Sequence, residues 1–210
     1  MSNKYQLVLF DVDSTLIEQE VIDLLANKTE HGHHVAEITR RAMAGELNFD
    51  EAIRERVALL RGLPESVFET VLNEITFSPG ALALIRKLQE RQIRIGAVSG
   101  GFLNVLLPLF AEIRFDFLAA NTLEVANGAL TGQVIGSIVN RDVKKQKLFE
   151  FAEQFTIDIE KTVAVGDGAN DLEMIRAAGL GVSYRGKPIL NEAADVVLTE
   201  PQLNLLLNYL

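Results

Sequence analysis

The stretch "LVLFDVDSTL", residues 7–16, joins a short apolar run to two aspartates that are separated by a single valine. Residues 7–10 have the composition of a strand buried on both faces, and Asp11 and Asp13 follow where that strand ends. Neighbouring carboxylates repel each other and lose hydration when they are buried. The stretch therefore predicts a buried strand with a polar site at its carboxyl end.

Apolar runs of the same kind recur along the chain, with helical patterns between them. Strands are predicted at residues 6–12, 93–99, 115–120, 162–165, 180–183 and 196–198, and helices at about 81–92, 143–155 and 171–178. Strands that alternate with helices, several of them apolar throughout, are typical of an α/β fold with a mainly parallel sheet covered on both faces.

Two intervals depart from this alternation. Residues 17–76 read as helix after helix, which predicts a helical cap inserted into the α/β core, and Pro79-Gly80 marks the return to that core. Asn127-Gly128 is a strong hairpin signal and predicts a small antiparallel flap over about residues 121–136. We therefore expect a core of residues 1–16 and 77–210, with residues 17–76 as the cap.

Composition excludes several classes of protein. The net charge of -9, without blocks of like charge, argues against a nucleic-acid-binding surface. No stretch approaches the ~20 apolar residues of a membrane span, and the apolar run at residues 7–10 is too short for a secretory signal. The absence of cysteine excludes disulfides and thiolate ligands. We expect a cytoplasmic monomer or homodimer that acts on a small molecule.

Polar residues collect where the predicted strands end, which is where open α/β sheets bind ligands. Asp11 and Asp13 follow the first strand. A second polar group, "GDGAND", residues 166–171, places Asp167, Asn170 and Asp171 after another strand. Two acids at each strand end make a hard-oxygen pocket suited to Mg²⁺. A dication would offset the carboxylate repulsion and allow a phosphate to approach.

An anion site is predicted beside these acids. "SGG", residues 99–101, offers backbone N–H groups and a hydroxyl just before a predicted helix. The chain contains no G-x-x-x-x-G-K-[ST], which excludes a P-loop, and "GDGAND" lacks the third glycine of the dinucleotide-binding fingerprint.

Helical periodicity selects two cations. Lys144 falls within the apolar stripe of the predicted helix 143–155, so it needs an anionic partner. In "FDEAIRERVALLR", residues 49–61, Arg56 projects between the apolar residues of the inward face. With Glu20, which borders the apolar face of its own helix, Arg56 could bind a ligand that carries a carboxylate and an ammonium group.

Together, "DVDSTL", the serine of "AVSGG", a lysine in the first turn of a helix and "GDGAND" resemble the four motifs of the haloacid dehalogenase superfamily. The stretch "AMAGELNFDEAIRERVALLRGLP", residues 42–64, is similar to the cap of the branch that hydrolyses O-phospho-L-serine in the last step of serine biosynthesis. This resemblance implies a Rossmann-like core, a helical cap and a Mg²⁺-dependent phosphatase with an aspartyl-phosphate intermediate.

The resemblance also implies roles for the core residues. Asp11 would be the nucleophile and a metal ligand. Asp13 would act as general acid and then general base, and its backbone carbonyl would reach the metal. The phosphate would be held by Ser99, Gly100 and Lys144.

The remaining roles concern the second acidic motif and the cap. Asp167 would complete the metal ligands, Asp171 would support the metal shell, and Asn170 would contact the phosphoryl group. Glu20 and Arg56 would bind the substrate ammonium and carboxylate, with Met43 and Phe49 closing around the substrate or forming the core.

Simpler interpretations stand beside these. Asp11 and Asp13 could be an exposed strand end, Ser99 a helix cap, and Arg56 the partner of Glu20. The histidines of residues 31–34 are expected to be solvated in a loop. For function, the alternatives are a related phosphatase or phosphotransferase with another small phosphorylated substrate, and a signalling receiver domain that accepts phosphate on aspartate.

Overall fold

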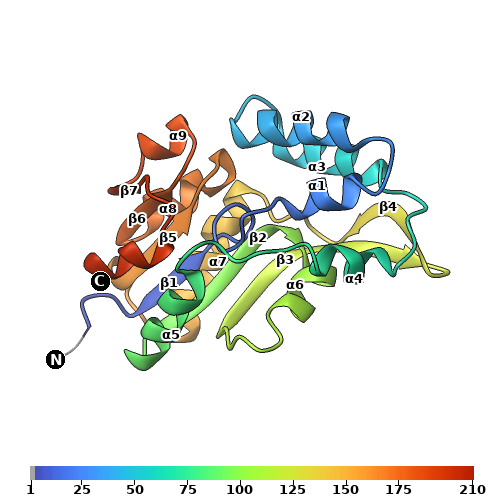
Figure 1. Cartoon of the computed structure of the whole chain (residues 1–210). Helices are drawn as coiled ribbons and strands as arrows, with labels where there is room; N and C mark the ends of the chain where they lie inside the picture. Colours follow the sequence, from blue (N-terminus) through green and yellow to red (C-terminus); the bar gives the residue numbers. More distant parts are fainter. Residues whose placement is uncertain (1–2) are drawn as a thin grey trace.

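The computed structural model describes residues 3–210. Seven strands form one sheet in the order β4-β3-β2-β1-β5-β6-β7 (Figure 1). Their bounds are β1 Leu7–Phe10, β2 Arg94–Phe102, β3 Phe117–Ala126, β4 Ala129–Ile135, β5 Thr162–Gly166, β6 Leu180–Tyr184 and β7 Val196–Leu198. Every neighbouring pair is parallel except β3 and β4, which are antiparallel. The predicted α/β fold with a mainly parallel sheet is confirmed.

β1 lies at the centre of the sheet, and its register decides what meets at the carboxyl edge. Phe10 pairs with Ala97 of β2 on one side and with Val165 of β5 on the other. The backbone N–H of Asp11 then donates to the carbonyl of Val165 at 2.8 Å. The residues that follow Phe10, Ala97 and Val165 are therefore brought to one place.

Side chains of β1 alternate between two core layers, as the pleat of a strand requires. Val8 and Phe10 pack in the layer that contains residues of α5 (Ala81–Glu90), α6 (Leu103–Leu109) and the 3-10 helix Leu203–Asn208. Leu7 and Leu9 pack in the other layer, against residues of α7 (Arg141–Gln154) and α8 (Leu172–Ala177). The sheet is thus covered on both faces, and β1 is buried throughout.

The predicted hairpin is present, but it is not a separate flap. Asn127 and Gly128 adopt the positive φ angles of 53° and 75° that a tight hairpin turn requires. β3 continues beyond the predicted end at residue 120, because its first part pairs with β2 and its second part pairs with β4. One strand therefore carries the hairpin directly from the main sheet.

Four helices occupy the interval between β1 and α5. They are α1 (Val21–Ala26), α2 (Gly32–Met43), α3 (Phe49–Ala58) and α4 (Val67–Leu72). In Figure 1, α1, α2 and α3 lie together above the carboxyl end of β1, and α4 lies beside α6. The backbone at both ends of this interval is paired: Glu18 N donates to Thr76 O at 3.0 Å, and Ser78 N donates to Leu16 O at 2.9 Å.

The loop after α3 is hydrogen-bonded to the hairpin. Gly62 N donates to Leu130 O at 2.8 Å, and Leu130 N donates to Leu63 O at 2.8 Å. The helical insertion is therefore connected to the sheet both through its own two ends and through β4. The α4 end of the insertion and the edge of the sheet are held together by main-chain bonds.

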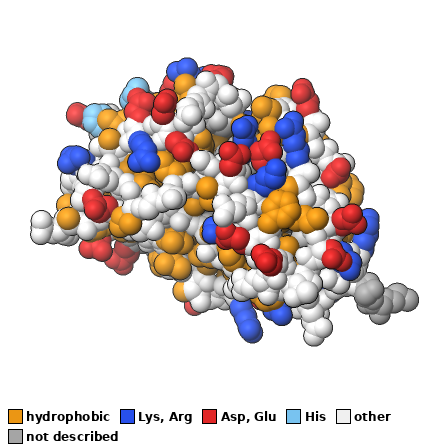
Figure 2. All heavy atoms as spheres, turned by 180° about the vertical axis from the view of Figure 1, so that it is seen from behind, with side chains coloured by type: hydrophobic (Ala, Val, Ile, Leu, Met, Phe, Trp, Pro, Cys, Tyr) orange, Lys and Arg blue, Asp and Glu red, His pale blue; other side chains and the backbone are white. Residues whose placement is uncertain are grey.

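One face of the molecule carries charged side chains of both signs. Figure 2 shows acidic and basic side chains interspersed over the face seen from behind. Among the described residues, no helix is long and apolar enough to cross a membrane. His33 and His34 are exposed, as expected, but they lie in the first turn of α2 instead of a loop. The expected cytoplasmic location stays a prediction.

Candidate active site

The centre of the site is a buried ion-pair cluster at the end of β1. Lys144, in the first turn of α7, has a fully buried side chain whose Nζ donates to Asp11 Oδ1 and, at 2.7 Å, to Asp171 Oδ1. Burial alone would lower the pKa of Lys144, but its two carboxylate partners raise the pKa overall. The anionic partner that periodicity predicted for Lys144 is present twice.

Three carboxylates lie close enough to share one cation. Oxygen atoms of Asp11, Asp167 and Asp171 all lie within 4.8 Å of one another. Asp171 is fixed by its own turn, because its Oδ2 accepts from the backbone N–H groups of Asp167 and Gly168 at 3.1 Å each. A Cβ on Gly166 would lie 2.4 Å from Asp171 Cγ, so glycine is needed for this close approach.

The protonation of these carboxylates reflects crowding in a buried place. Burial, and next the charge of Asp171, raise the pKa of Asp167 to about 7 and the pKa of Asp11 well above its ordinary value. Lys144 acts in the opposite direction on both groups. Hard, crowded oxygen donors of this kind fit a small divalent cation, which offsets their mutual repulsion.

The Asp13 carboxylate is held by hydrogen bonds from two elements, β2 and α1. Its Oδ2 accepts from Ser99 Oγ at 2.6 Å, and its Oδ1 accepts from Val21 N at 2.8 Å. Ser99 Oγ in turn accepts from Gly101 N at 2.7 Å. Burial raises the pKa of Asp13, while the hydrogen bonds from Ser99 and Val21 act in the opposite direction. Its carboxylate is therefore separate from the cluster formed by Asp11, Asp167 and Asp171.

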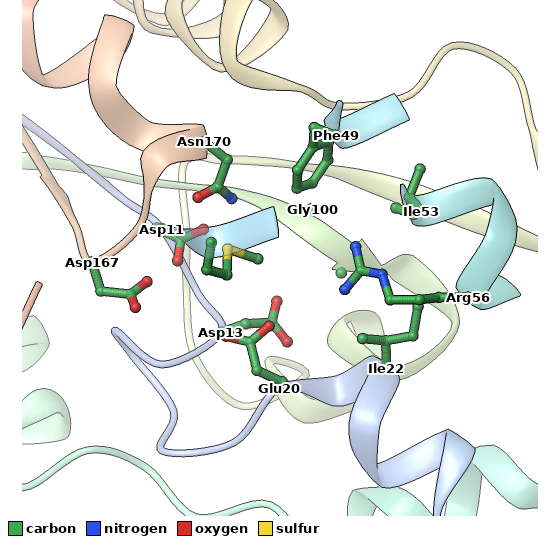
Figure 3. Close-up of a pocket in the computed structure, with 12 residues that line it drawn as sticks. Asp11, Asp13, Glu20, Ile22, Phe49, Ile53, Arg56, Gly100, Asp167 and Asn170 are labelled. Carbon is green, nitrogen blue, oxygen red and sulfur yellow. The ribbon is translucent and has the colours of Figure 1, made fainter. Parts of the chain in front are cut away.

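A small pocket lies between this rim and the helices α1 to α3 (Figure 3). Twelve residues line it: Asp11, Asp13, Glu20, Ile22, Met43, Phe49, Ile53, Arg56, Gly100, Gly101, Asp167 and Asn170. Nine of the twelve candidate site residues from the sequence are among them. The other three, Ser99, Lys144 and Asp171, lie behind the pocket wall and are 0% exposed.

Arg56 enters the pocket from α3 and is 2% exposed. Its Nε donates to Ala52 O at 3.1 Å, and its Nη1 donates to Thr39 Oγ1 at 3.0 Å. Within residues 3–210, no carboxylate pairs with it, so the alternative of an ion pair with Glu20 is wrong. Burial lowers the pKa of Arg56, and the carboxylates of Glu20 and Asp23 oppose that effect.

Glu20 enters the same space from the residue before α1, and Figure 3 shows its carboxylate beside that of Asp13. Ser14 Oγ donates to Glu20 Oε1 at 2.7 Å. Burial, followed by the charges of Asp13 and Asp167, raises the pKa of Glu20 to about 8. The pocket thus has a guanidinium on one side and two carboxyl groups facing it.

Met43 and Phe49 close the pocket from the helical side. A Cβ on Gly100 would lie 2.9 Å from Phe49 Cζ, and a Cβ on Gly168 would lie 3.0 Å from Met43 Sδ. The two side chains therefore rest directly on backbone of the core. Of the two interpretations left open for Met43 and Phe49, the structure supports a pocket wall.

Two lining residues, Ile22 and Ile53, were not among the site residues predicted from the sequence, whereas Gly101 belongs to the predicted "SGG" anion site. Ile53 lies one turn before Arg56 and could have been found from helical spacing. For Gly101 the structure adds the reason for a glycine, which is a tertiary contact: a Cβ there would lie 2.5 Å from Asp13 Oδ2.

This fold and this rim define a protein with an α/β core and a buried cluster of aspartates that could hold a metal ion. The model of haloacid dehalogenase-like hydrolases matches residues 8–176, and the chain belongs to this family. Among its relatives, the chain is similar to phosphoserine phosphatases. One from Streptococcus thermophilus is 48% identical over 203 residues, covering 97% of this chain and 94% of the relative.

Two solved structures agree with this placement. A phospho-aspartyl intermediate analogue of phosphoserine phosphatase has a TM-score of 0.95 at 39% identity, covering 99% of this chain and 100% of that one. A substrate-bound phosphoserine phosphatase complex has a TM-score of 0.96 at 39% identity, covering 99% of both chains. The chain spans about half the length, 49%, of the phosphoserine phosphatases it matches from Mycobacterium tuberculosis and Streptomyces coelicolor.

Proposed function

We propose that this chain hydrolyses O-phospho-L-serine to L-serine and phosphate with Mg²⁺ as its cofactor. The observation that carries the proposal is one pocket lined by Arg56, Glu20 and Asp11, in which the buried Arg56 pairs with no carboxylate of the described residues. An amino-acid substrate supplies the carboxylate for Arg56 and the ammonium for Glu20. Its phosphate would then lie toward the β1 rim.

Asp11 is the nucleophile in this proposal. Its carboxylate attacks phosphorus, the bond to the serine oxygen breaks, and an aspartyl-phosphate forms. Lys144 holds the Asp11 carboxylate in place and contributes positive charge near the transferring phosphoryl oxygens. Gly100 and Asn170 line the space around that phosphoryl group, and the buried Asn170 Oδ1 has no hydrogen-bond partner in the described part of the chain.

Asp13 acts as the acid and then as the base. In the first step it donates a proton to the leaving serine oxygen, for which a raised pKa is required at neutral pH. In the second step it accepts a proton from the water that attacks the aspartyl-phosphate, which releases phosphate and restores Asp11. Ser99 keeps the Asp13 carboxylate in a fixed orientation.

Asp11, Asp167 and Asp171 are the residues that would hold the cation, together with the backbone carbonyl of Asp13. When bound, Mg²⁺ supplies positive charge that offsets the phosphate charge and the repulsion among the carboxylates. We further propose that residues 17–76 act as the cap that covers this site and residues 1–16 and 77–210 as the core. Met43 and Phe49 would exclude water from the covered pocket.

Phosphate release from a panel of monoesters tests the proposal. O-phospho-L-serine should be hydrolysed in the presence of Mg²⁺, O-phosphoethanolamine much more slowly, and neither in the presence of a chelator. O-phosphoethanolamine is the matched comparison because it keeps the ammonium and phosphate groups and lacks the carboxylate. Equal kcat/KM for the two substrates would refute recognition of the carboxylate and would favour a related phosphatase with a different small substrate.

A further inference from the structure

The orientation of Arg56 depends on a side chain from another helix. Arg56 lies on α3, whereas Thr39, which accepts from Arg56 Nη1 at 3.0 Å, lies on α2. We propose that Thr39 is a positioning residue that aims the Arg56 guanidinium at the substrate carboxylate and so contributes to substrate specificity. This inference rests on the proposed function.

Two hydrogen bonds determine the plane of the guanidinium. Arg56 Nε donates to Ala52 O, one turn earlier on the same helix, and Nη1 donates to Thr39 Oγ1. Neither bond uses Nη2, and Figure 3 shows the guanidinium group as a whole extending into the pocket. Because a guanidinium is planar, bonds to Nε and Nη1 leave the remaining donors in a fixed direction.

The Thr39 hydroxyl is itself held from a third helix. Thr39 is 3% exposed, and its hydroxyl donates to Asp23 Oδ1 of α1 at 2.7 Å, with the carbonyl of Val35 at 3.0 Å as a second acceptor. Donation to either acceptor leaves an oxygen lone pair free for Arg56. Asp23, Thr39 and Arg56 therefore form one chain of hydrogen bonds across α1, α2 and α3.

A neutral acceptor at this position has a chemical consequence. If Asp23 paired with Arg56 directly, its carboxylate would occupy donors and neutralise charge that the substrate carboxylate needs. With Thr39 between them, Asp23 supports the cation at a distance, and Arg56 keeps donors for a bidentate contact. The hydroxyl thus orients Arg56 without competing with the ligand.

Thr39→Val removes the hydroxyl and keeps a branched side chain of similar shape. The KM for O-phospho-L-serine should rise about tenfold, the effect of one lost hydrogen bond to a charged group, with kcat nearly unchanged. The KM for O-phosphoethanolamine, which lacks the carboxylate, should change less than about twofold. Thr39→Ser, which restores the hydroxyl, should recover most of the affinity for O-phospho-L-serine.

Thr70→Val is the matched control. The Thr70 hydroxyl also donates to a carbonyl four residues earlier, that of Ser66, but it is exposed and lies on α4 away from the pocket. This variant should behave like the unmodified protein with both substrates. If Thr39→Val folds poorly, Thr39→Ala gives the same test, because it removes the hydroxyl without placing a methyl group against Arg56.

The outcomes separate this inference from the proposed function. Equal increases in KM for both substrates, or no rescue by Thr39→Ser, would show a structural role only and overturn the inference. Thr39→Val should also add little to Arg56→Ala, because Thr39 acts through Arg56, and additive effects would overturn the inference too. If Arg56→Ala itself fails to distinguish the two substrates, the proposed function is at fault.

Discussion

Lys144 and Arg56 are both buried cations, one in the core rim and one in the helical insertion, but their surroundings are opposite. Lys144 is paired with Asp11 and Asp171, and its pKa is raised. Arg56 has only neutral hydrogen-bond partners within the described residues, and its pKa is lowered by burial. Lys144 therefore has carboxylate partners within the protein, whereas Arg56 has none among the described residues and would gain one from a ligand.

This difference separates two functions that one pocket must perform. The ion pairs of Lys144 with Asp11 and Asp171 hold these side chains in place without a substrate. An unpaired buried guanidinium costs stability and gains a partner when a carboxylate binds. The rim is therefore suited to chemistry and the insertion to selection of the substrate, and the following substitutions test that division.

Asp11→Asn should give the largest effect. Loss of the nucleophile should lower kcat for O-phospho-L-serine by about 10³-fold or more, while the circular dichroism spectrum and thermal melting temperature stay close to those of the unmodified protein. Phosphate release measured with saturating Mg²⁺ is the readout. Turnover at the original rate would end the covalent mechanism.

Two single variants, Lys144→Met and Arg56→Met, compare the contributions of the two cations to stability. Lys144→Met leaves Asp11 and Asp171 uncompensated, so the free energy of unfolding at pH 8 should fall by about 3–5 kcal/mol. Arg56→Met breaks no ion pair and should change it by about 1 kcal/mol or less. Urea denaturation without added metal measures both values. Equal decreases in the free energy of unfolding would show that Lys144 and Arg56 do not differ in how their charges are compensated.

Arg56→Ala should raise the KM for O-phospho-L-serine by about 100-fold, because a charge-assisted contact with the carboxylate is lost. For O-phosphoethanolamine the change should be about threefold or smaller. Steady-state kinetics with both substrates gives the comparison. Arg54→Ala is the control, because Arg54 is an exposed arginine on the same helix. A similar change with both substrates would place Arg56 outside carboxylate recognition.

Substitution of Glu20 should have the smallest effect on the KM for O-phospho-L-serine, and that effect should depend on pH. With a pKa of about 8, Glu20 is mostly neutral below pH 8 and charged above it. Only the charged form attracts an ammonium group, and its share rises about eightfold between pH 7 and pH 8.5, so the KM for O-phospho-L-serine should fall by up to about eightfold. Glu20→Gln cannot titrate and should show a flatter profile. An unchanged profile in this variant would exclude Glu20 as the titrating group.

The rim could be predicted from sequence because its placement follows from general geometry. Residues after neighbouring parallel strands meet at one edge, so Asp11, Ser99 and Asp167 could be grouped before any coordinates were known. Lys144 could be added because helical periodicity places it on the buried face of α7. Asn140 offered a further signal that was not used: its side chain caps α7, accepting from Asp142 N and Val143 N at 3.1 Å each.

The support for Arg56 could not be predicted in the same way. Thr39 lies 17 positions away along the chain, and its contact with Arg56 depends on which faces of α2 and α3 meet. Periodicity identifies the inward face of each helix, but it does not give the rotation of one helix about another. The continuous β3 was missed for a related reason, because pairing with β4 extends the strand beyond the apolar run that predicted it.

The paired backbone at the two ends of the insertion would allow residues 17–76 to be replaced as one unit. Ile17 forms an antiparallel bridge with Phe77, so the chain leaves and re-enters the α/β unit at adjacent points. A short turn could join those points without disturbing the strand order, since β1 is already held by β2 and β5. Helices α1 to α4 could thus be exchanged for a different helical insertion by recombination. Such an exchange would leave the site at the end of β1 in place and change the substrates that reach it.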